Sequence, residues 1–161
     1  MDSKFRQRVE NFLAQKNIAF AGFSSEGAEV ANGLYKKFKE NGYHTIAINP
    51  KFEEVKSVPC YPNLKSVPEK VDAVMISTPP QATFDVVKEC IELGIKHVWI
   101  HKSIGNGSFN AEAVELAEKS GLEIIPMACP MMFLKPDPFH ACFRFILNIR
   151  GKLKIKDFQK N

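Results

Sequence analysis

The chain has 161 residues, of which 45% are apolar and 25% charged, and its formal net charge at pH 7 is +4. This length predicts a single domain with a sizeable core, and the composition excludes a disordered chain. The charge is too small to require a nucleic acid as partner. No apolar run approaches the roughly 18 residues of a membrane-crossing helix, and no signal peptide pattern opens the chain. The expected location is therefore cytoplasmic.

The charge is unevenly distributed along the chain. Residues 143–161 contain six cations and one acid, a local charge of +5, whereas everything before them sums to −1. This basic tail favours an acidic partner. The four cysteines form no C-x-x-C pair, so free thiols are expected instead of a zinc or redox motif.

Apolar periodicity predicts the elements in chain order. A helical stripe at about 4–15 comes first. Short runs that are apolar on both faces then predict buried parallel strands at 18–21, 45–48, 73–76, 98–100 and 123–125. Amphipathic segments that alternate with these strands predict helices at 29–41, 83–93 and 110–120. This alternation is typical of an α/β protein, a Rossmann-like doubly wound parallel sheet of about five strands within one domain, 1–161.

The C-terminal part begins at a break in the chain. Pro136-Asp137-Pro138 interrupts the pattern, and the apolar residues of 139–149 predict a final helix that packs back on the sheet. A C-terminal helix plus basic tail is therefore expected over about 137–161.

In such a sheet, ligands bind beyond the carboxyl ends of the strands, near the point where the strand order reverses. The first strand leads into a G-x-S-x-x-G loop, Gly22-Phe23-Ser24-Ser25-Glu26-Gly27, where a dinucleotide fold has G-x-G-x-x-G. The glycines allow close backbone approach to a phosphate, and the serines add donors. An ordinary strand-to-helix turn is the alternative interpretation.

The second strand ends in Asn49-Pro50-Lys51, where a classical NAD site has an acidic residue. A cation at this point favours a phosphate on the adenosine ribose, as in NADP or coenzyme A. A surface lysine after a proline turn is the alternative.

The third and fourth strands also end in candidate ligand contacts. Thr78-Pro79-Pro80 forms a stiff apolar wall suited to an adenine or an aliphatic arm. The loop that follows Ile100 brings His101 and a second lysine, Lys102, together with permissive glycines, which suits an anion. Loops of this fold commonly carry Gly and Pro, so each is equally consistent with an ordinary connection.

Several segments resemble a known family in their order and spacing: Gly22-Phe23-Ser24, residues 42–51 with G-Y-x-x-x-x-x-N-P-K, residues 59–64 with P-C-Y-P-x-L, Val71-Asp72, Val98-Trp99 and Cys129-Pro130. They resemble the stand-alone CoA-binding domain family, which is similar to the N-terminal domain of the succinyl-CoA synthetase alpha subunit. The resemblance implies that the loop 22–27 holds the CoA phosphates and that Lys51 lies near the phosphorylated ribose. It also implies that 78–80 and 100–103 form the sides of the nucleotide site.

The sequence departs from this resemblance in two respects. The second domain of the synthetase, with its phosphorylated histidine, has no counterpart in these residues, so ligase activity is not implied. Glu26 stands where phosphate is expected and would repel it.

Catalytic and metal sites are weaker hypotheses. Cys129 with His101 could form a nucleophilic pair, but no third orienting residue is evident. The spacing of Cys129, His140 and Cys142 matches no established metal motif, so no metal site is expected.

The sequence thus predicts a protein that binds CoA or acyl-CoA without catalysis of its own. The alternative is a small NADP-dependent oxidoreductase or reductase subunit. The expected partner is a small nucleotide ligand, with neither nucleic acid nor membrane, and the oligomeric state stays open. The predicted contact residues are Gly22, Phe23, Ser24, Ser25, Gly27, Asn49, Pro50, Lys51, Thr78, Pro79, Pro80, Ile100, His101 and Lys102.

Overall fold

A computed structural model describes residues 1–25, 29–51, 53–102 and 107–155. The helices are α1 (Ser3–Leu13), α2 (Glu29–Glu40), α3 (Pro80–Glu92), α4 (Ala111–Lys119) and α5 (Pro138–Ile149), with short 3-10 helices η1 (Leu64–Ser66) and η2 (Pro130–Met132). The strands are β1 (Asn17–Ala21), β2 (His44–Ile48), β3 (Glu54–Val55), β4 (Val58–Tyr61), β5 (Ala73–Ile76), β6 (His97–His101) and β7 (Glu123–Ala128).

The strands form one sheet in the order β3-β4-β2-β1-β5-β6-β7. All pairs are parallel except β3 with β4, so the predicted doubly wound α/β class is confirmed. The sheet has two more strands than the expected five. β3 has only two residues and β4 contains Pro59, so neither has the long apolar run that revealed the other strands.

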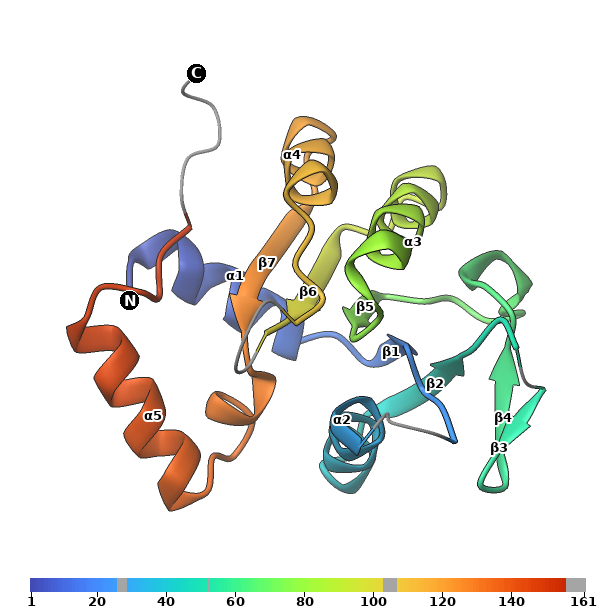
Figure 1. The fold of residues 1–161 in the computed structure, drawn as a ribbon, viewed down its shortest axis with the longest axis horizontal. Helices are drawn as coiled ribbons and strands as arrows, with labels where there is room; N and C mark the ends of the chain where they lie inside the picture. The colour runs from blue at the N-terminus through green and yellow to red at the C-terminus, as the bar shows by residue number, and fades with distance from the viewer. Residues whose placement is uncertain (26–28, 52, 103–106, 156–161) are drawn as a thin grey trace.

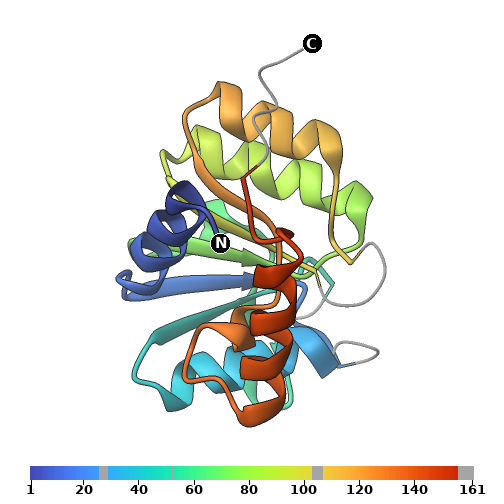
Figure 2. The same cartoon turned by 90° about the vertical axis from the view of Figure 1, so that its left-hand side faces the viewer.

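Helices cover both faces of the sheet (Figures 1 and 2). On one face, side chains of α1 and α2 form an aromatic core in which the Phe12 and Trp99 rings are 5.2 Å apart, edge to face. On the other face, α3 and α4 pack through small aliphatic residues such as Val87 and Val114. The sheet is therefore buried on both sides, which leaves the ends of the strands accessible to a ligand.

Helix α5 differs from the prediction. Asp137 caps it by accepting a hydrogen bond from the His140 backbone N–H (3.0 Å), but the helix contains no buried residue. Its contacts with the body include η2, and it lies at the margin of the molecule (Figure 1). The expectation that it packs its apolar side on the sheet is wrong for most of that side: Leu147 packs against the core cluster, whereas Phe139, Phe143, Phe145, Ile146 and Ile149 are exposed.

The segment after α5 returns to the body, where Leu153 and Ile155 are buried. Lys156, Asp157 and Lys160 of the predicted basic tail lie outside the described residues. Within the described part of the chain, no helix is long and apolar enough to cross a membrane.

Candidate functional site

The sheet order brings four predicted segments to one edge. Adjacent strands β2, β1, β5 and β6 are parallel, so their carboxyl ends lie side by side. From β1 the chain adds β2, β4 and β3 on one side of the sheet, and then β5, β6 and β7 on the other side. The strand order therefore reverses between β1 and β5. We call the residues that directly follow these four strands, together with His101 at the end of β6, the carboxyl edge.

Gly22 lies at this reversal point, immediately after β1. Its φ angle is +103°, and a Cβ atom there would lie 2.6 Å from the backbone oxygen of Ser77. The Ser77 backbone N–H donates to the Ala21 carbonyl (2.8 Å), which holds the two chain segments together. Only glycine fits this conformation and this close contact, so the predicted tight turn is present.

The loop after Gly22 is anchored to α2 by Asn32. The Ser24 backbone N–H donates to Asn32 Oδ1 (3.2 Å), and Asn32 Nδ2 donates to the Ser24 carbonyl (2.7 Å). Phe23 points away from the edge, because its side chain is buried against Tyr35 with ring centroids 4.8 Å apart. Ser25 is exposed. Glu26 and Gly27 lie outside the described residues.

Asn49 joins the ends of β1 and β2. Its side chain is buried, and its Nδ2 donates to the Phe23 carbonyl (2.5 Å) while its Oδ1 accepts from the Lys51 backbone N–H (2.7 Å). Asn49 therefore shapes the loop instead of offering its amide to a ligand. The turn leaves Pro50 and Lys51 exposed at the carboxyl edge.

The β5–α3 connection is tied to the chain after β6. Thr78 Oγ1 lies 3.0 Å from Thr83 Oγ1, which donates to the Ser108 carbonyl (2.9 Å). Asn110 Nδ2 donates to the Pro80 carbonyl (2.9 Å). Pro79 and Pro80 form the start of α3, so this apolar wall is held rigidly.

Two residues in neighbouring positions at this edge each have a buried polar atom without a partner. Ile76 and Ile100 are paired in the sheet, so the residues that follow them, Ser77 and His101, occupy neighbouring positions. Ser77 Oγ and His101 Nε2 have no hydrogen-bond partner among the described residues. Such atoms are costly inside a protein, and a ligand with polar groups would satisfy them. Burial lowers the pKa of His101 to about 4, so the ring is neutral at pH 7.

Lys102 and Ile100 flank His101 but differ in environment. Ile100 is fully buried in the core beneath α3 and α4, so its side chain does not contact the edge. Lys102 Nζ lies 5.5 Å from the centroid of the Phe109 ring. With neighbouring strands about 4.8 Å apart, the ends of β2 and β6 are separated by about 14 Å. Lys51 and Lys102 are therefore suited to different anionic groups of one ligand.

The two weaker hypotheses gain no support from the geometry. Cys129 follows Ala128, the strand partner of His101, but burial raises the pKa of its thiol and so disfavours the reactive thiolate. Over residues 1–25, 29–51, 53–102 and 107–155, no three His, Cys, Asp or Glu side chains are grouped so that they could hold a metal ion.

Three positioning residues were not predicted. Asn32, Thr83 and Asn110 bind backbone groups that are 8, 25 and 30 residues away along the chain. No local sequence pattern distinguishes Asn32 and Thr83 from ordinary helix residues. Asn110 alone had a signal, because an Asn before an amphipathic stretch is typical of a helix N-cap, and it does cap α4.

Residues 16–135 match the CoA binding domain family, and the chain belongs to this family. The match includes every segment of the carboxyl edge. The chain is 26% identical over 155 residues to acetate–CoA ligase (ADP-forming) I of Archaeoglobus fulgidus, covering 90% of this chain and 22% of that protein. It is 25% identical over 130 residues to the uncharacterized protein YneT of Bacillus subtilis, covering 80% of this chain and 93% of that protein.

Solved structures agree with the fold. A hypothetical protein from Pyrococcus horikoshii superimposes with a TM-score of 0.70 and 32% identity, covering 79% of this chain and 87% of that one. The chain spans about a fifth of the length of the Archaeoglobus ligase. α5, which starts at Pro138, follows the region that matches the family.

Proposed function

We propose that this protein binds coenzyme A or an acyl-CoA at the carboxyl edge. The observation that carries the proposal is the position of Gly22 at the strand-order reversal, where its backbone meets that of Ser77 within the region matched by the CoA binding domain family. This arrangement lets a phosphate approach backbone N–H groups closely, beside the start of α2.

The chemistry of the edge suits each part of CoA. The backbone and serines of 22–25 would hold the pyrophosphate, and exposed Lys51 would pair with the phosphorylated ribose. The Pro79-Pro80 wall would contact the adenine or the pantetheine arm. Ser77 Oγ and His101 Nε2 would hydrogen-bond polar groups of the ligand.

Lys51 does not distinguish CoA from NADP, because both ligands carry a phosphate on the adenosine ribose. CoA is favoured because of the family and the relatives that this chain resembles. The family and the acetate–CoA ligase relatives are named for CoA. We further propose binding without catalysis. Burial raises the pKa of the Cys129 thiol further above 7, which disfavours the thiolate, and His101, with a pKa of about 4, is a weak base.

Isothermal titration with CoA, acetyl-CoA, ADP, NAD and NADP tests the proposal. CoA is expected to bind with a Kd below about 1 mM, at least tenfold more tightly than NAD or NADP. An absence of CoA binding in this range would overturn the proposal. Tighter binding of NADP than of CoA would instead support the oxidoreductase alternative.

A further inference from the structure

The outward side of α5 carries a cluster of exposed apolar side chains. The exposed fractions are 71% for Phe139, 65% for Phe145 and 69% for Ile149. We call the following residues the α5 patch: Phe139, Cys142, Phe143, Phe145, Ile146 and Ile149, all of them exposed. At about 100° per residue they cover an arc of about 160° of the helix, which is the width of a core-facing stripe.

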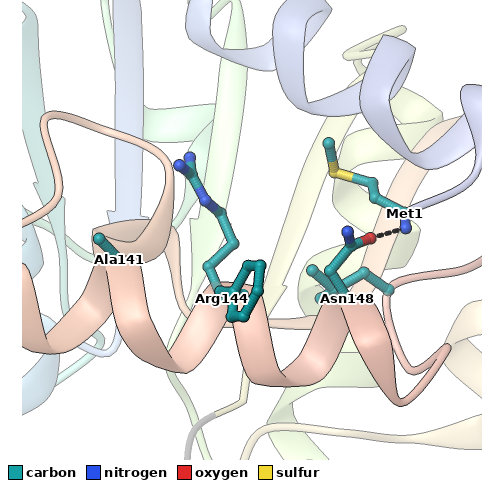
Figure 3. Close-up of a pocket in the computed structure, with 6 residues that line it drawn as sticks. Met1, Ala141, Arg144 and Asn148 are labelled. Atoms are coloured by element: carbon teal, nitrogen blue, oxygen red, sulfur yellow. Dashed lines mark hydrogen bonds between the residues drawn. The ribbon is translucent and has the colours of Figure 1, made fainter.

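The polar side chains of α5 turn toward the body instead. Arg144 lies over the Phe133 ring, 5.9 Å from its centroid, and Asn148 Oδ1 accepts a hydrogen bond from the amino group of Met1. Figure 3 shows Arg144 and Asn148 on one side of the helix, with Asn148 pointing to Met1. Leu147, on the same side of α5, packs against the core cluster. These three contacts hold α5 so that its apolar stripe is left outside.

A hollow of about 480 Å³ adjoins the patch. It lies between α5 and the two terminal segments (Figure 3). Its lining residues are Met1, Ala141, Arg144, Phe145, Asn148 and Leu153. Phe145 belongs both to the hollow and to the patch, so a partner seated on α5 could also fill the hollow.

We propose that the α5 patch is the interface of a homodimer, in which the α5 helices of two copies pack antiparallel about a two-fold axis. An aromatic side chain has roughly 200 Å² of surface, so the patch presents on the order of 500 Å² of apolar area per copy. Complete burial of these side chains in two copies would remove on the order of 1,000 Å² from solvent, which is the lower limit for a specific interface. A two-fold axis makes one patch complementary to itself.

Charge at the helix ends supports the antiparallel arrangement. The patch itself is uncharged, whereas Asp137 precedes α5 and Arg150 follows it. Backbone and side-chain hydrogen bonds from His140 lower the pKa of Asp137, so its carboxylate is charged at pH 7. Antiparallel packing places Asp137 of one copy opposite Arg150 of the other and opposes the two helix dipoles.

The same charges argue against a lipid surface as the occupant. A helix that lies on a membrane carries several cations on its polar side. Within Pro138–Ile149 the Lys or Arg residue is Arg144, and it packs over Phe133 of the body, whereas Arg150, Lys152 and Lys154 follow the end of the helix. A second protein copy therefore fits the patch better than a bilayer does.

Sedimentation equilibrium of the full chain at about 100 μM tests the proposal, with a mass twice that of the chain as the expected result. Phe143→Glu should weaken association at least about 100-fold, because it buries an unpaired charge. Leu93→Glu is the matched control, since Leu93 at the end of α3 is 44% exposed and Phe143 is 42% exposed. A monomeric wild-type chain, or equal effects of the two variants, would overturn the proposal.

Cysteine cross-linking provides a second measurement on the unaltered interface. Cys142 lies within the patch, so a short bis-maleimide should link two wild-type copies and fail to link Cys142→Ser. Flotation with vesicles of neutral and anionic phospholipid tests whether the α5 patch binds lipid instead of a second copy. A wild-type chain that is not cross-linked but floats with vesicles would assign the patch to lipid and overturn the dimer.

Discussion

The carboxyl edge and the α5 patch show opposite mismatches between side-chain polarity and solvent exposure. At the carboxyl edge, the polar atoms Ser77 Oγ and His101 Nε2 are buried without partners. At the α5 patch, apolar rings such as Phe139 and Phe145 are exposed to water. We propose that a small polar ligand relieves the first mismatch and an apolar protein surface the second. The contrast thus predicts two separate sites of different chemistry on one small domain.

The largest expected effect is the pH dependence that His101 gives to the free energy of unfolding. The folded pKa is about 4, against about 6.5 in the unfolded chain, so the unfolded state binds more protons between these values. The free energy of unfolding should therefore fall as the pH drops through 6.5, with a total loss of about 3 kcal/mol below pH 4.

Urea unfolding of wild type and His101→Asn from pH 7 to pH 4 isolates this effect, since carboxylates that titrate in the same range cancel in the difference. The advantage of wild type over the variant should shrink as the pH falls. A difference that is constant with pH would show that His101 is not a buried neutral ring.

A smaller effect is expected for Gly22→Ala. Strain at φ +103° and the clash with the Ser77 oxygen should lower the free energy of unfolding by about 2–3 kcal/mol and weaken CoA binding at least tenfold. Gly42→Ala is the control, because Gly42 also has a positive φ (+85°) but has no neighbouring atom within 4 Å of its Cβ position. Gly42→Ala should cost about 1 kcal/mol and leave CoA affinity unchanged. Equal losses of affinity would remove Gly22 from the site.

We expect Lys51 to bind the ribose phosphate of CoA and no other part of the ligand. Lys51→Ala is expected to weaken CoA about tenfold, or about 1.4 kcal/mol, and dephospho-CoA less than twofold in calorimetric titrations. Lys96→Ala is the control, because Lys96 is also exposed but precedes β6, at the opposite end of the strands. Similar losses for both ligands would contradict this role for Lys51.

The smallest effect is expected at the α5 patch. Ile149→Ser should change the free energy of unfolding of the monomer by less than about 0.5 kcal/mol, since Ile149 is 69% exposed. Its CoA affinity should equal that of wild type in the same titration. A loss of CoA affinity would show that the two regions are coupled.

The sequence predicted the fold class because strands buried on both faces read as continuous apolar runs. The ends of those runs then located the carboxyl edge. β3 and β4 escaped prediction because β3 has only two residues and β4 contains Pro59, so neither forms a long apolar run. Phe23 and Ile100 were predicted as contacts from position, but the direction of a side chain depends on which helix covers that face of the sheet.

The orientation of α5 could not be predicted for a related reason. Its periodicity shows that the helix has an apolar side, but the contacts of Arg144, Leu147 and Asn148 decide which side faces the body. Likewise, the hydrogen bonds of Asn49 to the Phe23 carbonyl and of Asn32 to the Ser24 backbone form only when the folded chain brings these segments together.

The most direct test is an NMR titration of the ¹⁵N-labelled chain with CoA, which reports on both regions at once. Amide shifts are expected to cluster at Gly22, Ser24, Lys51, Thr78 and Lys102, with the amides of α5 unchanged. An absence of shifts up to about 1 mM CoA, or shifts confined to the hollow beside α5, would contradict CoA binding at the carboxyl edge.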